Sequence, residues 1–443
     1  MSQIIYEEII YLDDGTSDSF AYQIPENYND NNEHPLLVVF HQWGGNHMSI
    51  FSTLFDEEAN LRNWVLLSPY GGSSNNYNHQ GAQLMVLEEI KSIQERYNID
   101  NNKIYMVGGS MGGAAGAIFA NNHLDPTEPM VAATASASGI LDCERRAIEM
   151  DGNNSMTEWF GGNWTEVPFE YHRNSAIYFA DTTNSMHYNL KYTPIYFDFG
   201  VTEPHRIHAE EMYDILLNYN ENIWIDLNPT GSHGFSVFDE SNVCDWLSQF
   251  VLNITPDYIN VNLDESARAY WIEIDNPYQI ENEFMKVVSS REVLENSLNI
   301  NIDLAENVSY NSIILHVLDD NYDYINLNYD FNLNQTNTIG LTGEFFNYIT
   351  YISVNNCDNC FYQENNIIWV NINSGNNNLE IHYPIDVNED GIWNILDILL
   401  TINFILDQLI PTNEQSIYAD INQDLEINIL DIMTMVNFIL TLS

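Results

Sequence analysis

The sequence has very little positive charge. Its 443 residues include 12 lysines and arginines against 64 aspartates and glutamates, which gives a formal net charge of -52. A surface this anionic repels nucleic acids and anionic membranes, so neither is expected as a partner. The composition is still that of a folded protein, because 45% of the residues are hydrophobic and 13% are aromatic.

Long apolar runs and a basic leader are also missing. The sequence has no run of about 18 apolar residues, so no transmembrane helix is predicted. The first eight residues contain no lysine or arginine and do not have the form of a signal peptide. We therefore expect either a cytosolic protein or a mature secreted form from which a signal has been removed.

Cysteine is scarce, with four residues, Cys143, Cys244, Cys357 and Cys360. The last two form a single Cys-x-x-Cys, which without a second pair predicts a local disulfide or two free thiols rather than a zinc site. Cys143 and Cys244 pair only if the fold brings them together. An even number of cysteines favours an oxidising compartment.

The first part of the chain, residues 1–254, alternates strand-like and helical patterns. The expected strands are residues 4–12, 19–24, 34–40, 64–68, 103–107, 131–135, 194–197 and 223–227. The expected helices are residues 82–97, 111–121, 208–219 and 239–252. This alternation predicts an α/β fold with a mostly parallel sheet, whose catalytic groups lie at the carboxyl ends of strands.

Ser110 is the candidate nucleophile. It lies in Gly108-Gly109-Ser110-Met111-Gly112-Gly113, between the apolar run 103–107 and an alanine-rich helical run, 114–121. A serine on a sharp turn from strand to helix needs small neighbours, and Gly108 and Gly112 lack the Cβ atoms that would clash. The other interpretation is an ordinary or phosphate-binding turn.

Two further loops supply the groups that a serine nucleophile needs. A glycine-rich loop at residues 41–46 follows a buried strand, and we assign the oxyanion donors to the backbone N–H groups of Trp43 and Met111. His233, between Ser232 and Gly234 after the last strand, is the candidate base. Serine, acid and histidine then follow one another along the chain.

The acid has two candidates in the segment after the strand 194–197. Glu203 lies in the loop, whereas Asp198 lies in the strand or at its edge, so Glu203 is preferred and Asp198 is kept as the alternative. A carboxylate here accepts the second imidazole N–H and stabilises the imidazolium.

These residues give the first part a resemblance to the α/β-hydrolase superfamily. It looks like the secreted esterases grouped with feruloyl esterases and polyhydroxybutyrate-depolymerase-like proteins, with some similarity to prolyl-oligopeptidase-like enzymes. The matching segments are residues 41–46, 108–113, 193–216 and 231–235. Gln42 stands where the family has glycine, and Glu203 where it usually has aspartate.

Substrate contacts are assigned to the start of the glycine-rich loop and to residues 139–191. We assign His41 and Gln42 in the loop, and Trp159 and Trp164 in the longer segment, where aromatic rings stack on a sugar or phenolic ring. The alternative for the two tryptophans is that they close a hydrophobic core.

The second part, residues 257–384, has short alternating stretches separated by turns rich in Asn, Asp and Gly. This spacing predicts an all-β sandwich that acts as a spacer or binds carbohydrate.

The third part, residues 385–443, contains the same loop twice, each followed by an apolar helix. The first loop places ligands at positions 1, 3, 5, 7, 9 and 12 with Asp386, Asn388, Asp390, Ile392, Asn394 and Asp397. The second repeats them with Asp420, Asn422, Asp424, Glu426, Asn428 and Asp431. Position 7 supplies a backbone carbonyl. This pattern predicts two structural calcium sites, and Leu425, in place of glycine at position 6, predicts that the second is weaker.

The duplicated loop resembles a dockerin module. The resemblance implies two calcium ions, an extracellular setting and, in many systems, a cohesin partner. Together the parts predict a secreted serine esterase that acts through an acyl-enzyme on carbohydrate-linked feruloyl or acetyl esters, without a catalytic cofactor. The alternatives are a serine peptidase, a polyester depolymerase and a non-enzymatic surface protein.

Overall fold

The computed structural model describes residues 4–152, 154–275, 282–295, 297–309, 311–318, 322, 324–331, 337–344, 351–357, 360–382, 386–388, 390, 394–421 and 425–441. The chain divides into two compact units, one formed by Met1–Tyr270 and Gln279–Val287 and the other by Trp271–Tyr278 and Val288–Ser443. The three domains expected from the sequence stay a prediction. No helix in the described ranges is long and apolar enough to cross a membrane.

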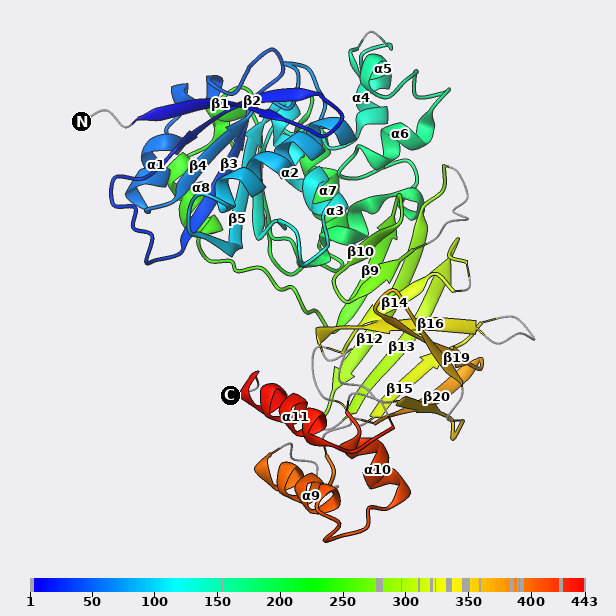
Figure 1. Ribbon diagram of the computed structural model, residues 1–443. Coiled ribbons are helices and arrows are strands. Elements are labelled where there is room, and N and C mark those ends of the chain that lie inside the picture. The colour runs from blue at the N-terminus through cyan, green and yellow to red at the C-terminus, as the bar shows by residue number, and fades with distance from the viewer. Residues whose placement is uncertain are drawn as a thin grey trace. The chain divides into compact units, whose positions relative to one another are not determined.

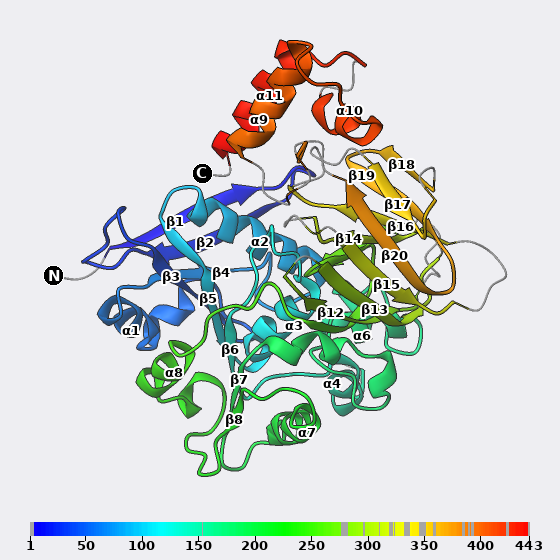
Figure 2. The ribbon, with the colours of Figure 1, turned by 90° about the horizontal axis from the view of Figure 1, so that it is seen from below.

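The first unit is built on one eight-stranded sheet, ordered β1-β2-β4-β3-β5-β6-β7-β8. Figure 1 labels β1 to β5 of this sheet, and Figure 2 also labels β6, β7 and β8. Its strands are β1 (Ile5–Tyr11), β2 (Ser17–Gln23), β3 (His34–Phe40), β4 (Val65–Pro69), β5 (Ile99–Gly109), β6 (Ala133–Ala137), β7 (Ile195–Asp198) and β8 (Ile223–Ile225). The pairs β1–β2 and β2–β4 are antiparallel, and the others are parallel. The predicted α/β fold with a mostly parallel sheet is confirmed.

Strand β3 shows why the centre of this sheet needs a continuous apolar run. Leu36 and Val38 pack in one hydrophobic core and Leu37 and Val39 in another, all with 0% exposure. Successive side chains of a strand point to opposite faces, so a strand covered on both faces is apolar throughout.

Helices cover both faces of the sheet, as Figure 2 shows. The first face is covered by α2 (Gln80–Gln94), α3 (Ala115–Asn122) and α7 (Arg206–Leu216). The second is covered by α1 (Phe55–Leu61) and α8 (Glu240–Leu247). Helix α1 is missing from the sequence prediction, because its short segment carries three acidic residues in its first turn and few apolar ones.

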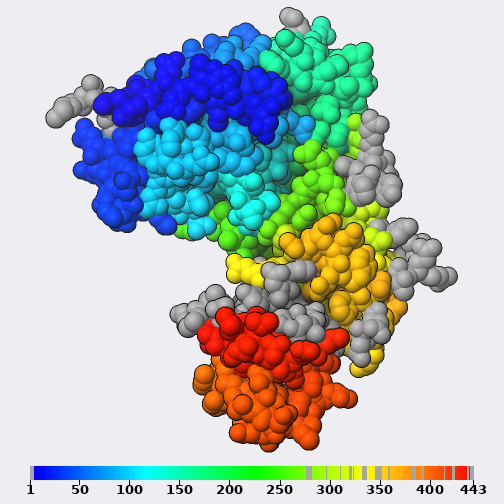
Figure 3. Space-filling model, viewed as in Figure 1, coloured from blue at the N-terminus to red at the C-terminus, as the bar shows by residue number. Residues whose placement is uncertain are grey.

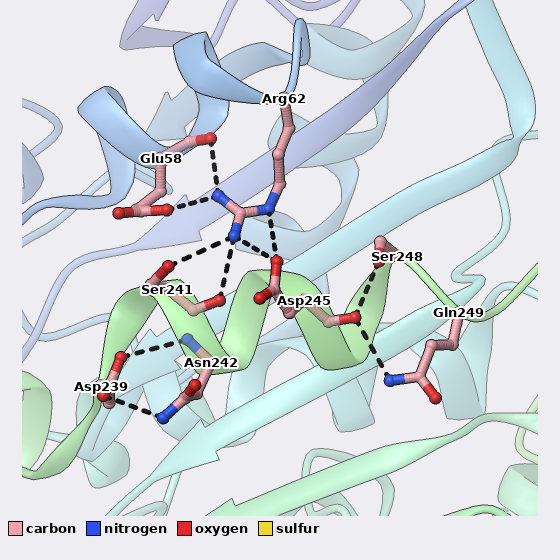
Figure 4. Close-up of polar contacts among 8 residues, drawn as sticks. All are labelled: Glu58, Arg62, Asp239, Ser241, Asn242, Asp245, Ser248 and Gln249. Carbon is pink, nitrogen blue, oxygen red and sulfur yellow. Dashed lines mark hydrogen bonds and ion pairs between the residues drawn. The ribbon is translucent and has the colours of Figure 1, made fainter.

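Arg62, at the C-terminal end of α1, joins α1 to α8 (Figure 4). Its guanidinium pairs with Glu58 on its own helix and with Asp245 on α8. It also donates to the Ser241 carbonyl at 3.1 Å. Helix α8 comes directly after the loop that carries His233. By pairing with α8, Arg62 fixes the segment that follows this loop.

Residues 139–191 form a separate group of short elements beside the sheet. They are the helices α4 (Cys143–Glu149), α5 (Met156–Trp159) and α6 (Pro168–Arg173) and the 3-10 turns η3 (Thr182–Asn184) and η4 (Met186–Tyr192). Met156, Phe160 and Tyr171 bury an apolar cluster that also contains Met111, the residue after Ser110. This group is therefore packed directly against the turn that carries the candidate nucleophile. Strands β9 (Tyr258–Leu263) and β10 (Ala267–Ala269) also belong to the first unit.

The second unit contains strands in the orders β11-β14-β16-β19-β18 and β17-β20-β15-β13-β12. They are β11 (Ile272–Ile274), β12 (Met285–Val293), β13 (Ser297–Glu306), β14 (Ile313–His316), β15 (Tyr324–Tyr329), β16 (Asn337–Thr342), β17 (Tyr351–Val354), β18 (Phe361–Glu364), β19 (Ile367–Ile372) and β20 (Gly375–His382). The predicted all-β character of this part is confirmed. Strands β10 and β11 are separated at Tyr270, whose φ of 56° does not fit an extended strand.

The cysteines resolve the alternatives left by the sequence. Cys357 and Cys360 form a disulfide, so the Cys-x-x-Cys closes a local loop. Cys143 and Cys244 are both buried and remain free thiols.

The described C-terminal helices are α9 (Ile395–Ile405), α10 (Asn413–Ala419) and α11 (Ile429–Thr441), coloured orange to red in Figure 3. Helices α9 and α11 share a small core in which Ile398, Phe404 and Met435 are buried. Asn394 caps α9 by accepting a hydrogen bond from the Leu396 N–H at 2.7 Å. The predicted pair of apolar helices, one after each loop, is confirmed.

Candidate active site

Ser110 lies on a strained turn between β5 and the 3-10 turn η2 (Ser110–Ala114). Its φ is 55°, a left-handed conformation that is uncommon for a residue with a side chain. A Cβ on Gly108 would lie 2.2 Å from the Gly112 carbonyl oxygen, and one on Gly112 would lie 2.5 Å from the His41 carbonyl oxygen. The two glycines are therefore required by close backbone approach, as the sequence pattern predicted.

His233 lies next to Ser110, in the loop between β8 (Ile223–Ile225) and the 3-10 turn η5 (Gly234–Val237). Its Nε2 is 2.9 Å from Ser110 Oγ. The loop is fixed at Gly234, whose N–H donates to Ser138 Oγ at 3.0 Å. The side chain of His233 is 41% exposed, so the imidazole stays open to solvent on one side.

Glu203 completes the relay. Its Oε2 is 2.5 Å from His233 Nδ1, and its Oε1 accepts the Gly200 N–H at 2.7 Å. Burial, with only 4% of the side chain exposed, favours the protonated carboxyl. Hydrogen bonds from His233, Ser138 and Gly200 outweigh burial and lower the pKa of Glu203 below its ordinary value. The carboxylate therefore stays charged and holds the proton of His233 on Nδ1.

Asp198, the alternative acid, lies elsewhere. It is 2% exposed, and its Oδ1 accepts the Phe199 N–H at 2.7 Å rather than a proton of His233. Burial raises the pKa of Asp198 to about 7. The structure brings Glu203 to the imidazole and leaves Asp198 within the end of β7.

The two residues predicted to donate to the oxyanion lie at the same cavity as Ser110. Trp43 and Met111 both line it. Within the described residues the Trp43 N–H has no hydrogen-bond acceptor. Met111 is the second residue of η2, and the first N–H groups of a helix have no partner inside it. Both N–H groups are thus available to a negative oxygen.

The loop residues before Trp43 are placed differently from one another. Gln42 lines the cavity. His41 is 3% exposed, and its ring nitrogens lie 2.8 Å and 2.9 Å from the carbonyl oxygens of Gln42 and Tyr70. The structure does not bring His41 to the cavity, because these two bonds turn its ring into the loop.

Trp159 and Trp164 are likewise absent from the described lining of the cavity. Both pack against the apolar cluster of residues 139–191. Trp159 stacks on His79 with ring centroids 4.6 Å apart. The geometry favours the interpretation that they close a core.

The cavity beside Ser110 has a volume of about 400 Å³. Its described lining is Gln42, Trp43, Tyr77, Ser110, Met111, Ile140, Arg146, Met150, His205 and His233. Five of these residues were not predicted from the sequence: Tyr77, Ile140, Arg146, Met150 and His205. Only fold topology brings these residues to the serine, and the one available signal was their position in the segments that follow strands.

The described parts of the two C-terminal loops fit calcium. Asp397 and Asp431, at position 12 of each loop, are both 0% exposed. Asp397 accepts the Asn388 and Asn394 N–H groups at 3.2 Å and 2.9 Å, and Asp431 accepts the Asn428 N–H at 2.8 Å. Each loop thus buries one carboxylate at position 12, and a bound cation would balance its charge. Ile392, Asn422 and Asp424 lie outside the described residues.

The C-terminal residues 384–440 match the dockerin type I domain. Dockerin type I domains generally bind calcium, which agrees with the carboxylates just described. Residues 384–440 are called the dockerin-like module. Position 6 of the second loop of this module is Leu425, where glycine is usual. Leu425 has a φ of 67°, so this loop contains a strained residue.

The first unit has the α/β-hydrolase fold. Its sheet places Ser110 after β5, Glu203 after β7 and His233 after β8, in the order serine, acid, histidine. A likeness is found to S-formylglutathione hydrolase from Staphylococcus aureus, with 14% identity, TM-score 0.44 and coverage of 56% of this chain and 99% of that one. A ferulic acid esterase has 13% identity, TM-score 0.41 and coverage of 56% and 95%.

The acylaminoacyl peptidase of Pyrococcus horikoshii has 14% identity, TM-score 0.41 and coverage of 56% of this chain and 40% of that one. No curated protein matches the sequence.

Proposed function

We propose that this protein is a serine carboxylic-ester hydrolase that acts through an acyl-enzyme. The observation that carries the proposal is the relay of Ser110, His233 and Glu203, with contacts of 2.9 Å and 2.5 Å, at the edge of an open cavity. A serine hydroxyl in contact with an imidazole whose second nitrogen faces a carboxylate is the arrangement that activates a serine for attack.

In the acylation step, Ser110 Oγ forms a bond to the ester carbonyl carbon while His233 Nε2 takes the hydroxyl proton. The carbonyl oxygen becomes an oxyanion and accepts the N–H groups of Trp43 and Met111. The tetrahedral species then collapses. The bond to the alcohol oxygen breaks, and the alcohol leaves with the proton that His233 returns.

In the deacylation step, a water molecule takes the place of the alcohol. His233 accepts one proton from the water, whose oxygen attacks the acyl carbon. Collapse releases the acid and returns the proton to Ser110 Oγ. Glu203 stays ionised through both steps and stabilises the imidazolium each time it forms.

The dockerin-like module supports a carbohydrate-linked ester, feruloyl or acetyl, as substrate. Proteins that carry dockerin domains are typically extracellular or on the cell surface, and dockerin domains bind cohesins. We infer a secreted protein with two structural calcium ions and a cohesin-like partner. Both loops lead into exposed apolar pairs, Ile395 with Leu396 and Ile429 with Leu430, each residue at least 53% exposed. Such a surface suits an apolar partner.

The experiment is hydrolysis of p-nitrophenyl acetate, methyl ferulate, acetylated xylan and a peptide anilide by the full chain and its Ser110→Ala variant. The proposal expects ester turnover in the wild type and a loss of at least about 10³-fold in the variant. Turnover of the anilide without the esters contradicts the esterase proposal and identifies a peptidase. No turnover of any ester contradicts the esterase proposal for these substrates and favours a peptidase or a binding module.

A further inference from the structure

The cavity beside Ser110 has a positively charged lining, although the chain as a whole is strongly negative. The protein has 64 acidic and 12 basic residues. Among the described residues that line this cavity, however, there is one arginine, Arg146, and no aspartate or glutamate. A positive group in a concave site of an anionic protein focuses the local field and attracts negative charge.

Arg146 is held in place without being saturated. It lies on α4, and its Nη1 donates to Glu149 Oε2 at 3.2 Å, one turn further along the helix. Its Nε–H is buried and has no acceptor among the described residues. Arg146 also interacts with the side chain of Tyr77. A guanidinium carries five N–H donors in a fixed plane, so donors remain for a ligand beside these two partners.

Glu149 orients Arg146 through an ion pair. It pairs with Arg146 and lies 3.5 Å from His208 Nε2, yet it is not among the residues described as lining the cavity. The His208 contact lowers the pKa of Glu149 to about 2, so this carboxylate stays charged. A charged partner thereby orients Arg146, and Arg146 is the member of the pair that lines the cavity.

The neighbouring histidines do not make this group a metal site. Glu149, His205 and His208 bring three ligand atoms within 4.8 Å of one another. The Leu141 N–H, however, donates to His208 Nδ1 at 3.2 Å, so the neutral ring carries its proton on Nε2, toward Glu149. A nitrogen that carries a proton has no lone pair for a metal ion.

We propose that Arg146 makes the site selective for esters that carry a carboxylate near the scissile bond. The planar fork of a guanidinium fits the two oxygens of a carboxylate, and Ile140 and Met150 supply apolar walls for the carbon skeleton. The proposal rests on the proposed esterase function and narrows its substrate class. An esterified acidic sugar is a substrate of this kind.

The test compares pairs of esters that differ by one carboxylate. On the acyl side, p-nitrophenyl hydrogen glutarate is compared with p-nitrophenyl pentanoate, in which a methyl group replaces the carboxylate. On the alcohol side, para-acetoxybenzoate is compared with its methyl ester. The wild type is expected to prefer the anionic member of one pair by at least about tenfold in kcat/KM, and the preferred pair identifies which half carries the carboxylate.

The variants are Arg146→Met and, as a matched control for the loss of one positive charge, Arg206→Met on α7. Arg206 pairs with Glu210 and does not line the cavity. Arg146→Met is expected to lower the preference about tenfold while hydrolysis of the neutral esters changes less than about threefold. Arg146→Lys is expected to restore part of the preference, and Arg206→Met to leave it unchanged.

Two results separate this inference from the proposed function. Hydrolysis of the neutral esters with no preference in either pair, or with a preference that survives in Arg146→Met, overturns the inference and leaves the esterase intact. Calorimetric binding of glutarate to the Ser110→Ala protein, lost in Ser110→Ala with Arg146→Met, supports the inference even where no ester is hydrolysed. Absence of that binding, together with absence of turnover, contradicts both.

Discussion

Gln42 and Gly234 lie in direct contact: a Cβ built on Gly234 would come within 1.6 Å of Gln42 Oε1. Gln42 belongs to the glycine-rich loop after β3, and Gly234 follows the candidate base. Gln42 also reaches Gly109, where a Cβ would meet its Cγ at 3.2 Å. The glutamine thus fills the space between the nucleophile turn and the histidine loop, and a larger residue at position 234 would displace the end of its side chain.

Gly234→Ala is expected to lower kcat/KM on p-nitrophenyl acetate at least about tenfold. The added methyl group displaces Gln42 or the histidine loop, and Ser110 and His233 separate. Gln42→Gly in the same chain removes the obstacle and is expected to restore part of the activity.

Gly15→Ala is the matched control for this pair. Gly15 has a φ of 85°, so alanine is strained there too, but nothing lies within 4 Å of its Cβ position. This variant is expected to lose some stability and no activity. Equal losses of kcat/KM in Gly15→Ala and Gly234→Ala would contradict the contact described above.

Glu203→Gln is expected to lower kcat by about 10³ to 10⁴, the usual effect of neutralising the acid of a serine triad. Asp198→Asn is expected to stay within about threefold of the wild type, because Asp198 bonds the Phe199 N–H and not His233. The pKa of Glu203 lies below the ordinary value of a glutamate. Glu203 therefore stays ionised at the pH where a free glutamate takes up a proton, and its protonation should not limit activity there. A larger loss in Asp198→Asn than in Glu203→Gln would make Asp198 the acid.

Glu89 predicts a pH dependence of stability. It is 0% exposed on α2, and burial together with the charge of Asp18 raises the pKa of its carboxyl well above the ordinary value. The folded state then keeps a proton that the unfolded chain releases, so stability is greatest below the unfolded pKa and falls as pH rises toward the folded pKa. Glu89→Gln is expected to raise the thermal midpoint at pH 8 more than at pH 5.

The exposed Glu88→Gln on the same helix controls for the change of charge, since its side chain is 43% exposed. It is expected to shift the midpoint equally at both pH values. An equal shift in Glu89→Gln would count against a raised pKa of Glu89.

Leu425→Gly is expected to tighten calcium binding at the second loop by roughly five- to tenfold. Leu425 has a φ of 67° and is 92% exposed, so glycine relieves about 1 kcal/mol of backbone strain and removes no packing. Calcium titration of the full chain, followed by calorimetry, measures the change. An unchanged affinity would show that strain at position 6 does not weaken the site.

The fold of the first unit could be predicted from the sequence because the patterns that indicate it are local. A strand buried on both faces, such as β3, must be apolar at every position, and the glycines around Ser110 are fixed by backbone approach within one turn. The dockerin-like loops are readable for the same reason, because calcium sets the spacing of their oxygen ligands.

The shape of the substrate cavity was not readable, because its walls come from separate segments. Tyr77, Ile140 and Arg146 meet only when the group of short helices packs over Met111. His41 shows the opposite error: it is the first residue of the glycine-rich loop, yet two carbonyl contacts turn its ring away from the cavity. Sequence order places a residue near a site, and packing decides which way its side chain points.

The most direct test of the account is the site of reaction with a fluorophosphonate probe. The full chain is labelled, digested and mapped by mass spectrometry, alongside Ser110→Ala and, as a control serine, Ser232→Ala in the histidine loop. The account predicts one adduct on Ser110, lost in Ser110→Ala and kept in Ser232→Ala. An adduct on another serine, or labelling that persists in Ser110→Ala, would contradict the assignment of Ser110 as the nucleophile.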